Sequence, residues 1–218
     1  MMSRMNNPLP GTLLVARHHE SEWNRLGEWT GTRDVHLTPY GVMKSGEMGA
    51  LIKDIHVDVV YVSTLIRTME TAHAMLAAMG QPDVPIERSA AHNERDYGDY
   101  TGKNKWEMEK ILGEGEFERV RREWDCPVPN GETLKMVYAR VTPFYEETLL
   151  PLLAAGKNIL LVSHGNAIRA LMKYIESIPD EKVHEEEMLF GAVVIYRVDA
   201  EGKMESKEVR KIESKVNA

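Results

Sequence analysis

The sequence has almost no cysteine, no long apolar run and no excess of positive charge. Cys126 is the single cysteine among 218 residues, so no disulfide can form within the chain, which is typical of a reducing, cytoplasmic compartment. No stretch approaches the roughly 20 apolar residues of a membrane helix, and residues 1–11 lack an apolar run of signal-peptide length. We therefore expect a cytoplasmic protein with no membrane partner and a disordered lead-in at 1–11.

The charge balance argues against nucleic acids and membrane surfaces as general partners. The net charge is −7, whereas proteins that bind nucleic acid or membrane surfaces generally carry an excess of basic residues. A single local basic pocket remains compatible with this balance. The hydrophobic content of 43% is enough for an ordinary core, and the length suits one domain over 1–218.

Apolar runs alternate with helical patterns along the chain. The runs at 12–16, 57–63 and 158–163 are apolar throughout, which favours parallel strands covered on both faces, and a further strand is expected at 192–198. The sequence thus predicts an α/β fold, a three-layer sandwich with a mostly parallel central sheet and helices on both faces. Helices are expected at 38–54, 64–80, 131–156 (interrupted by Pro143 and Pro151) and 166–177. A helical insertion is expected at 91–129, and a short strand plus a mobile tail or lid at 199–218.

Polar side chains follow three of these predicted strands at the point where each ends. Ligands of open α/β sheets bind beyond the carboxyl ends of the strands, so these side chains are expected to meet at one edge. One such ending is easily produced by chance, but matching endings on separate strands are not. They are Arg17, His18 and His19 after the first strand, Ser63 and Arg67 after the second, and Ser163, His164, Gly165 and Asn166 after the third.

This combination of residues points to phosphoryl transfer. Arginine forks bind phosphate oxygens in pairs, and a neutral imidazole is a competent nucleophile toward phosphorus. Positive charge around the transferred group would replace a metal ion. The leaving oxygen would need a proton donor, for which Glu94 in "HNERDYG" is the candidate.

Other chemistries fit less well. His18 and His19 are adjacent in a predicted strand and point to opposite faces, so they cannot readily share a metal ion. A cysteine-dependent phosphatase needs an arginine six residues after its nucleophile, but Cys126 is followed there by Glu132, and no GxxxxGK[ST] loop occurs. A non-catalytic module that binds phosphorylated ligands remains open, because it would use the arginines equally well without Glu94.

Five motifs together resemble the histidine phosphatase superfamily, and more narrowly its cofactor-dependent phosphoglycerate mutase branch. The resemblance spans about residues 13–196. It implies interconversion of 3-phosphoglycerate and 2-phosphoglycerate in glycolysis and gluconeogenesis, through a phosphohistidine primed by 2,3-bisphosphoglycerate, without a metal. A broad-specificity histidine acid phosphatase is the alternative. The motifs are "VARHHESEWN", "EWTGTRDVHLTPYG", "STLIRTMETA", "HNERDYGDYTGKNK" and "VSHGNAIRALMKYI".

The resemblance also implies roles for individual residues. His18 would be the phosphorylated nucleophile and Glu94 the proton donor and acceptor. The phosphate pocket would comprise Arg17, Arg67 and His164, assisted by Asn24, Thr30 and Gly31; the rest of the substrate would be held by Tyr97, Lys105, Arg121, Arg122, Gly165 and Asn166. By pattern alone, the arginine pair could equally be a solvated helix face, and Asn24 a helix cap. Family members are often oligomers, so a homo-oligomer is compatible with this sequence.

Two features depart from the family pattern. His19 stands where the family usually has glycine, and a positive φ there would make histidine costly. The connection from Arg122 to Gly131 is shorter than in many mutases, which favours a more open site and some phosphatase activity. We also expect His18 to be neutral and His164 to be available as a charged partner, with the basic C-terminal tail closing the site.

Overall fold

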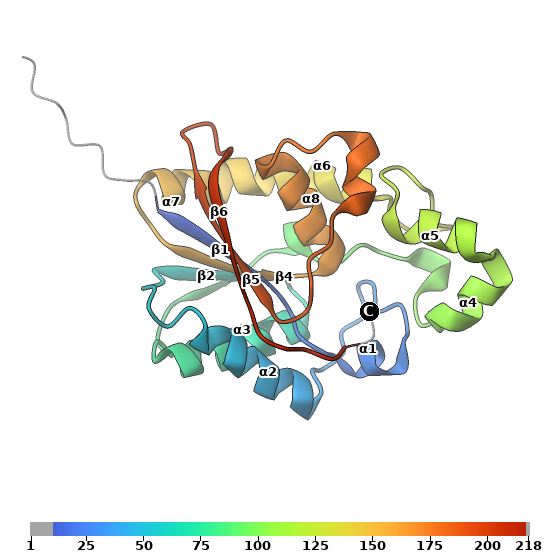
Figure 1. Ribbon diagram of the computed structural model, residues 1–218, viewed down its shortest axis with the longest axis horizontal. Helices are drawn as coiled ribbons and strands as arrows, with labels where there is room; N and C mark the ends of the chain where they lie inside the picture. The colour runs from blue at the N-terminus through green and yellow to red at the C-terminus, as the bar shows by residue number, and fades with distance from the viewer. Residues whose placement is uncertain (1–10, 217–218) are drawn as a thin grey trace, which may run out of the picture.

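A six-stranded sheet forms the centre of the computed structural model, which describes residues 11–216 (Figure 1). The strand order is β3-β2-β4-β1-β5-β6. The first four strands in this order are parallel to one another, β5 pairs antiparallel with β1, and β6 pairs antiparallel with β5. The expected α/β fold with a mostly parallel sheet is therefore confirmed. The strands are β1 (Thr12–Arg17), β2 (Val59–Val62), β3 (Ile86–Arg88), β4 (Ile159–Ser163), β5 (Ala192–Val198) and β6 (Met204–Lys211).

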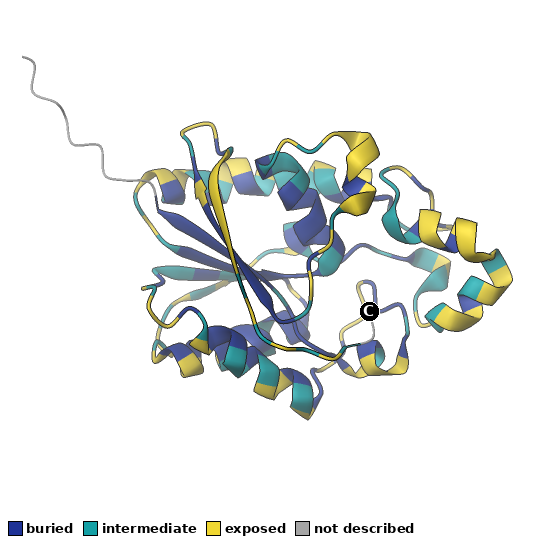
Figure 2. Cartoon of the chain, viewed as in Figure 1, coloured by how far each residue is buried: buried dark blue, intermediate teal, exposed yellow. Residues whose placement is uncertain are grey.

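Helices cover both faces of the sheet because the central strands are apolar on both sides. Along β1, Leu14 and Ala16 join the apolar cluster with α2 and α3, whereas Leu13 and Val15 join the one with α6 and α8. Figure 2 shows β1, β4 and β5 buried between partly exposed helices, with β6 exposed at the edge. These helices are α2 (Pro39–Ala50), α3 (Ile66–Met79), α6 (Leu134–Phe144), α7 (Leu150–Ala154) and α8 (Gly165–Ile175).

The helix signals in the sequence work as expected. The Thr38 hydroxyl accepts a hydrogen bond from the Gly41 amide at 3.0 Å and caps α2, with Pro39 as its first residue. Gly80 ends α3 in the left-handed conformation. The long predicted helix at 131–156 is broken into α6, the π-helical turn η3 (Tyr145–Leu149) and α7, after Pro143 removes a backbone donor.

A cap, residues 89–133, projects beyond the carboxyl ends of the strands, as α4 and α5 show in Figure 1. It has its own apolar cluster around Trp29, a residue of the loop that follows α1 (Glu22–Leu26). The cap contains the short helices η1 (Ala90–His92) and η2 (Gly98–Tyr100), α4 (Lys105–Leu112) and α5 (Glu114–Arg122); η4 (Asp180–Glu185) lies between α8 and β5. The expected helical insertion is therefore present.

Both ends of the chain need a correction. Gly11 is buried, and its amide donates to the Leu153 carbonyl at 2.8 Å, so the expected lead-in does not extend to residue 11; residues 1–10 lie outside the described range. The short strand expected within 199–218 is β6, which pairs with β5 over eight residues (204–211), so it takes up more of this stretch than a short strand followed by a tail would. Residues 217 and 218 are also outside the described range.

Candidate active site

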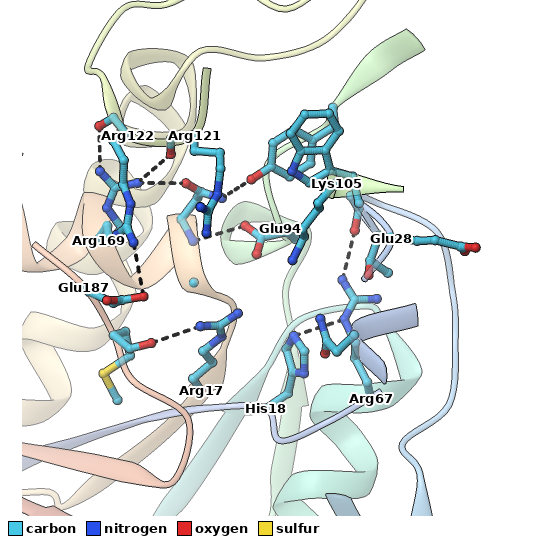
Figure 3. A pocket seen from close by; sticks show the side chains of 18 residues that line it. Arg17, His18, Glu28, Arg67, Glu94, Lys105, Arg121, Arg122, Arg169 and Glu187 are labelled. Carbon is cyan, nitrogen blue, oxygen red and sulfur yellow. Dashed lines mark hydrogen bonds and ion pairs between the residues drawn. The ribbon is translucent and has the colours of Figure 1, made fainter. Parts of the chain in front are cut away.

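A pocket lies where β1, β2 and β4 end and the cap begins (Figure 3). His164 lies beside it, with its ring centroid 5.0 Å from that of His18. The topology thus brings together every residue that the sequence suggested for the site. Those that line the pocket are Arg17, His18, Asn24, Thr30, Gly31, Arg67, Glu94, Tyr97, Lys105, Arg121, Arg122, Gly165 and Asn166.

The hydrogen bonds of His18 fix which ring nitrogen can react. Its Nδ1 lies 2.7 Å from the carbonyl oxygen of His19, and because a carbonyl only accepts, Nδ1 carries the proton. In the neutral ring, Nε2 therefore keeps its lone pair. Arg67 Nε donates to this atom at 3.3 Å, while the two terminal nitrogens of Arg67 donate to the carbonyls of Arg33 and Gly31. The Nε2 lone pair thus lies at the pocket, where it accepts a hydrogen bond from a fixed guanidinium.

Burial and neighbouring arginines keep both central imidazoles neutral. Desolvation, reinforced by Arg67 and Arg17, lowers the pKa of His18 well below its usual value. The pKa of His164 is also lowered well below its usual value, mainly by burial and then by Arg67. The lowered pKa of His18 agrees with the neutral ring that the sequence analysis expected. His164 was expected to be charged, and its lowered pKa makes that expectation wrong for the ligand-free site. The reason is that His164 is fully buried beside cations, with no carboxylate against its ring.

Several buried polar atoms around His18 have no partner among residues 11–216. They are Arg17 Nε, Thr30 Oγ1 and His164 Nδ1. Arg17 is otherwise engaged, because its Nη1 donates to the Met188 carbonyl at 3.1 Å and its guanidinium lies 3.7 Å from the Phe190 ring centroid. Buried polar atoms are normally satisfied, so these atoms indicate where an anion with several oxygens would bind.

Glu94 is held by two backbone amides. Its Oε1 accepts from the Arg95 amide at 2.8 Å and from the Asn166 amide at 3.2 Å, at the start of α8. The side chain of Asn166 in turn donates to the Tyr97 hydroxyl at 2.9 Å. The second carboxylate oxygen of Glu94 is left available to exchange a proton with a ligand, as general acid–base chemistry requires.

Two arginines fix the segment that carries Glu94. Arg140 on α6 donates to the carbonyls of Ala91, Asn93 and Glu94 at 2.7, 2.9 and 3.1 Å. Arg95, fully buried, donates to three carbonyls at the other side of the cap, those of Val120, Cys126 and Glu132. Neither arginine drew attention in the sequence, because their partners are carbonyls that no side-chain pattern reveals.

A second group of cations lies farther from His18. Lys105 begins α4, and Arg121 and Arg122 end α5; all three line the pocket, so the arginine pair is not simply a solvated helix face. Burial, together with the positive charges of Arg17 and Arg121, lowers the pKa of Lys105 to about 8. Asn24 combines both of its suggested roles, since it bonds Ser21 in a capping box and also lines the pocket.

The sequence reasoning missed part of the lining. Arg169 was detectable as the one arginine in an otherwise apolar stretch of α8, one turn after Asn166. Its guanidinium donates to the carbonyls of Arg121 and Arg122 at 3.2 and 2.7 Å and thereby ties the end of α5 to α8. Glu28 and Trp29 begin the motif "EWTGTRDVHLTPYG" but were given no role, and Glu187 and Met188 gave no pattern in the sequence.

The structure gives a reason for His19. Within residues 11–216, only Asn130 and Ser177 are non-glycine residues with positive φ, so the expected backbone strain at His19 is absent. The His19 ring is buried, accepts from the Glu20 amide at 2.8 Å through Nδ1, and places Nε2 2.9 Å from the Ser214 hydroxyl. A side chain here therefore holds the C-terminal segment, which a glycine could not do.

The C-terminal segment approaches the site, but not by means of its basic residues. After β6 it runs past Phe190 and His19, and the amide of Lys215 donates to the Tyr40 hydroxyl at 3.2 Å. Lys207 pairs with Glu176 and Arg210 with Asp54, both on other parts of the surface. Lys207 and Arg210 are therefore engaged away from the site, whereas the segment after β6 reaches it, and closure of the site by the tail stays a prediction.

Two kinds of feature are absent from residues 11–216. No group of three or more histidine, cysteine, aspartate or glutamate side chains has the arrangement of a metal site. No helix in the same range is long and apolar enough to cross a membrane.

Comparison with known proteins agrees with this geometry. The family model of the histidine phosphatase superfamily (branch 1) matches residues 13–209. A 2,3-bisphosphoglycerate-dependent phosphoglycerate mutase of Parvibaculum lavamentivorans is 38% identical over 203 residues, covering 92% of this chain and 97% of that protein.

Solved structures share the fold. A phosphoglycerate mutase from Bacillus anthracis superposes with a TM-score of 0.76 at 22% identity, covering 96% of this chain and 95% of its own. The alpha-ribazole phosphatase from Shigella flexneri superposes with a TM-score of 0.75 at 23% identity, covering 93% and 96%. The family match, the identity to the mutase and the shared fold together show that this chain belongs to branch 1 of the histidine phosphatase superfamily.

Proposed function

We propose that this protein is a 2,3-bisphosphoglycerate-dependent phosphoglycerate mutase that interconverts 3-phosphoglycerate and 2-phosphoglycerate through phosphorylated His18. The observation that carries the proposal is one pocket that combines two groups of side chains. At one end His18 Nε2 faces Arg67 and Glu94, and at the other lies a separate set of cations, Lys105, Arg121 and Arg122. A site that only removed phosphate would not need the second set. The relative from Parvibaculum lavamentivorans supports the same activity by its name.

The residues present fit such a ligand. The buried donors without partners, Arg17 Nε and Thr30 Oγ1, would bind oxygens of the transferred phosphoryl group, together with Arg67. The carboxylate and the second phosphate would lie against the cations of α4 and α5. When bound, 2,3-bisphosphoglycerate supplies the phosphoryl group that primes the enzyme.

The chain's own residues would perform the transfer steps. His18 Nε2 gives up the hydrogen bond from Arg67 Nε and attacks phosphorus with its lone pair. The proton stays on Nδ1, and its hydrogen bond to the His19 carbonyl stabilises the positive charge that develops on the ring. Glu94 protonates the oxygen that leaves and later removes the proton from the hydroxyl that attacks the phosphohistidine. The surrounding guanidinium groups neutralise charge on the equatorial oxygens.

Hydrolysis of small phosphomonoesters is the second candidate function. The observation that favours it is the short connection of the cap, since only residues 123–133 join α5 to α6. A small cover excludes water less well, and water can then attack the phosphohistidine.

A coupled assay on 3-phosphoglycerate in EDTA, with and without 2,3-bisphosphoglycerate, tests the proposal while phosphate release is followed in parallel. Stimulated isomerisation with little phosphate release supports the mutase, and phosphate release alone supports the phosphatase. His18→Ala is the control, because it should abolish either activity while the fold, followed by circular dichroism, is unchanged. Absence of both activities in the wild type would contradict the proposal and leave a binding module.

A further inference from the structure

A carboxylate lies among the cations at the end of the pocket remote from His18. Glu187 belongs to the segment between η4 and β5 and lines the pocket. The next residues of that segment are fixed by Arg17, which donates to the Met188 carbonyl at 3.1 Å and lies 3.7 Å from the Phe190 ring centroid. Glu187 is therefore positioned by the arginine that adjoins the proposed nucleophile, and its place is not that of a free surface acid.

Glu187 is engaged with a cation that the proposed substrate also needs. Its Oε1 lies 3.4 Å from Arg122 Nη2, and the side chains are 36% and 26% exposed respectively. Figure 3 shows the carboxylate between the side chains of Arg17 and Arg122. Its negative charge acts on Arg17 as well, raising the Arg17 pKa against the larger effect of burial.

The other two acids of the pocket are placed differently. Glu94 is held by backbone amides beside His18, at the reacting end. Glu28 adjoins Trp29 at the base of the cap and forms no ion pair within residues 11–216. Glu187 alone among the three occupies a position where a second anionic group of a ligand would pair with Arg122.

We propose that Glu187 is a specificity-determining residue, which weakens the binding of phosphorylated ligands in proportion to the negative charge at their remote end. A remote anion must share Arg122 with this carboxylate and is repelled by it, whereas a neutral remote group is not. In a mutase this would favour exchange of the bisphosphate over its retention. The inference rests on the proposed function only for the choice of ligands.

The chain offers a matched control in Glu118. Its carboxylate also pairs with the arginines of α5, at 3.0 Å from Arg121 Nη1 and 3.9 Å from Arg122 Nε. It is 49% exposed and does not line the pocket. Replacing Glu118 removes the same charge from the same arginine without changing the anion inside the pocket.

The test compares Glu187→Gln and Glu118→Gln, each in a His18→Ala background that prevents transfer. Calorimetric titrations at constant ionic strength would use glycerol 3-phosphate, 3-phosphoglycerate and 2,3-bisphosphoglycerate, whose remote ends carry no charge, one negative charge and about three negative charges. We expect Glu187→Gln to tighten binding of the second ligand about threefold and of the third about thirtyfold, and to leave the first within about twofold. Glu118→Gln should change all three by less than about twofold.

The outcomes separate this inference from the proposed function. An equal change for all three ligands, or no change, would overturn the role of Glu187 even if the wild type is a mutase. The graded change in a protein without mutase activity would support Glu187 and contradict the proposed function. Failure of every variant to bind any of the three ligands would overturn both.

Discussion

Mild acid should destabilise this protein strongly, because four imidazoles are buried in the neutral form. His18, His19, His92 and His164 are each at most 3% exposed. Desolvation is the largest cause of their lowered pKa values, which reach about 4 for His19 and about 3 for His92. Below pH 6.5 the unfolded chain binds protons on these rings and the native protein does not. Stability is therefore expected to fall as the pH falls, until the native pKa values are reached.

The size of the effect follows from the unfolded state. The native pKa values of His19 and His92 are about 4 and about 3, and those of His18 and His164 are lowered well below their usual value. A ring that stays neutral in the native protein at pH 5.5 costs about 1.4 kcal/mol relative to pH 7.5, because its pKa in the unfolded chain is near 6.5. Four rings together cost roughly 5 kcal/mol, a large part of the ~5–15 kcal/mol of an ordinary domain. For a chain of this length this lowers Tm by roughly 10–20 °C. His36, whose exposed ring bonds Glu70, has a raised pKa and acts in the opposite direction.

Thermal unfolding followed by circular dichroism at pH 7.5, 6.5 and 5.5 would measure this, in buffers free of phosphate. His92→Gln removes one buried ring away from the pocket and should reduce the loss by about 1.4 kcal/mol. His73→Gln on α3 is the control, because that ring is exposed and its replacement should leave the pH slope unchanged. A Tm that changes by less than about 3 °C between pH 7.5 and 5.5, or an unaltered slope in His92→Gln, would refute the reasoning.

Three further predictions concern individual residues. Because the Lys105 pKa is about 8, deprotonation above that pH should remove a cation and raise KM for 3-phosphoglycerate, and Lys105→Arg should flatten this alkaline limb in steady-state assays. His19→Gly should free the segment around Ser214 without increasing kcat, since no backbone strain is relieved. Limited proteolysis from the C-terminus would measure the freed segment, steady-state assays would measure kcat, and a higher kcat would contradict the prediction. Arg140→Lys should remove the guanidinium that donates to three carbonyls and lower the free energy of unfolding by about 2 kcal/mol. Because Glu94 would then shift, kcat should fall by more than KM changes. An unchanged kcat would show that this anchor does not position the acid.

The sheet and the reacting end of the pocket were predictable because their signals are continuous in the chain. The apolar runs before Arg17 and before His164 mark buried strands, and their polar ends meet wherever parallel strands end. A short strand was expected within 199–218, but the extent of β6 was not, because nearly all of its side chains are exposed and it is held by backbone pairing to β5. Sequence periodicity reports burial, so it does not mark the ends of an exposed edge strand.

The parts of the site that escaped prediction depend on contacts between distant elements. Arg169 and Arg140 bind carbonyls of the cap, which lie far from them in the sequence. Glu187 matters only because its segment passes Arg122, and His19 only because the C-terminal segment returns to it. The family pattern gave the expected glycine at position 19 but not the reason for its replacement.

The separate apolar cluster of the cap has a consequence for how the molecule opens. Trp29, Phe117 and their neighbours form a small core distinct from the two clusters that flank the sheet. Small clusters open at lower free energy than the global core, so amides of α4 and α5 should exchange with solvent sooner than those of β1 and β4. Lys105 and Arg121 are carried by this less stable unit, while His18 is carried by the sheet. Warming should therefore weaken substrate binding and raise KM at a lower temperature than the one at which kcat begins to fall.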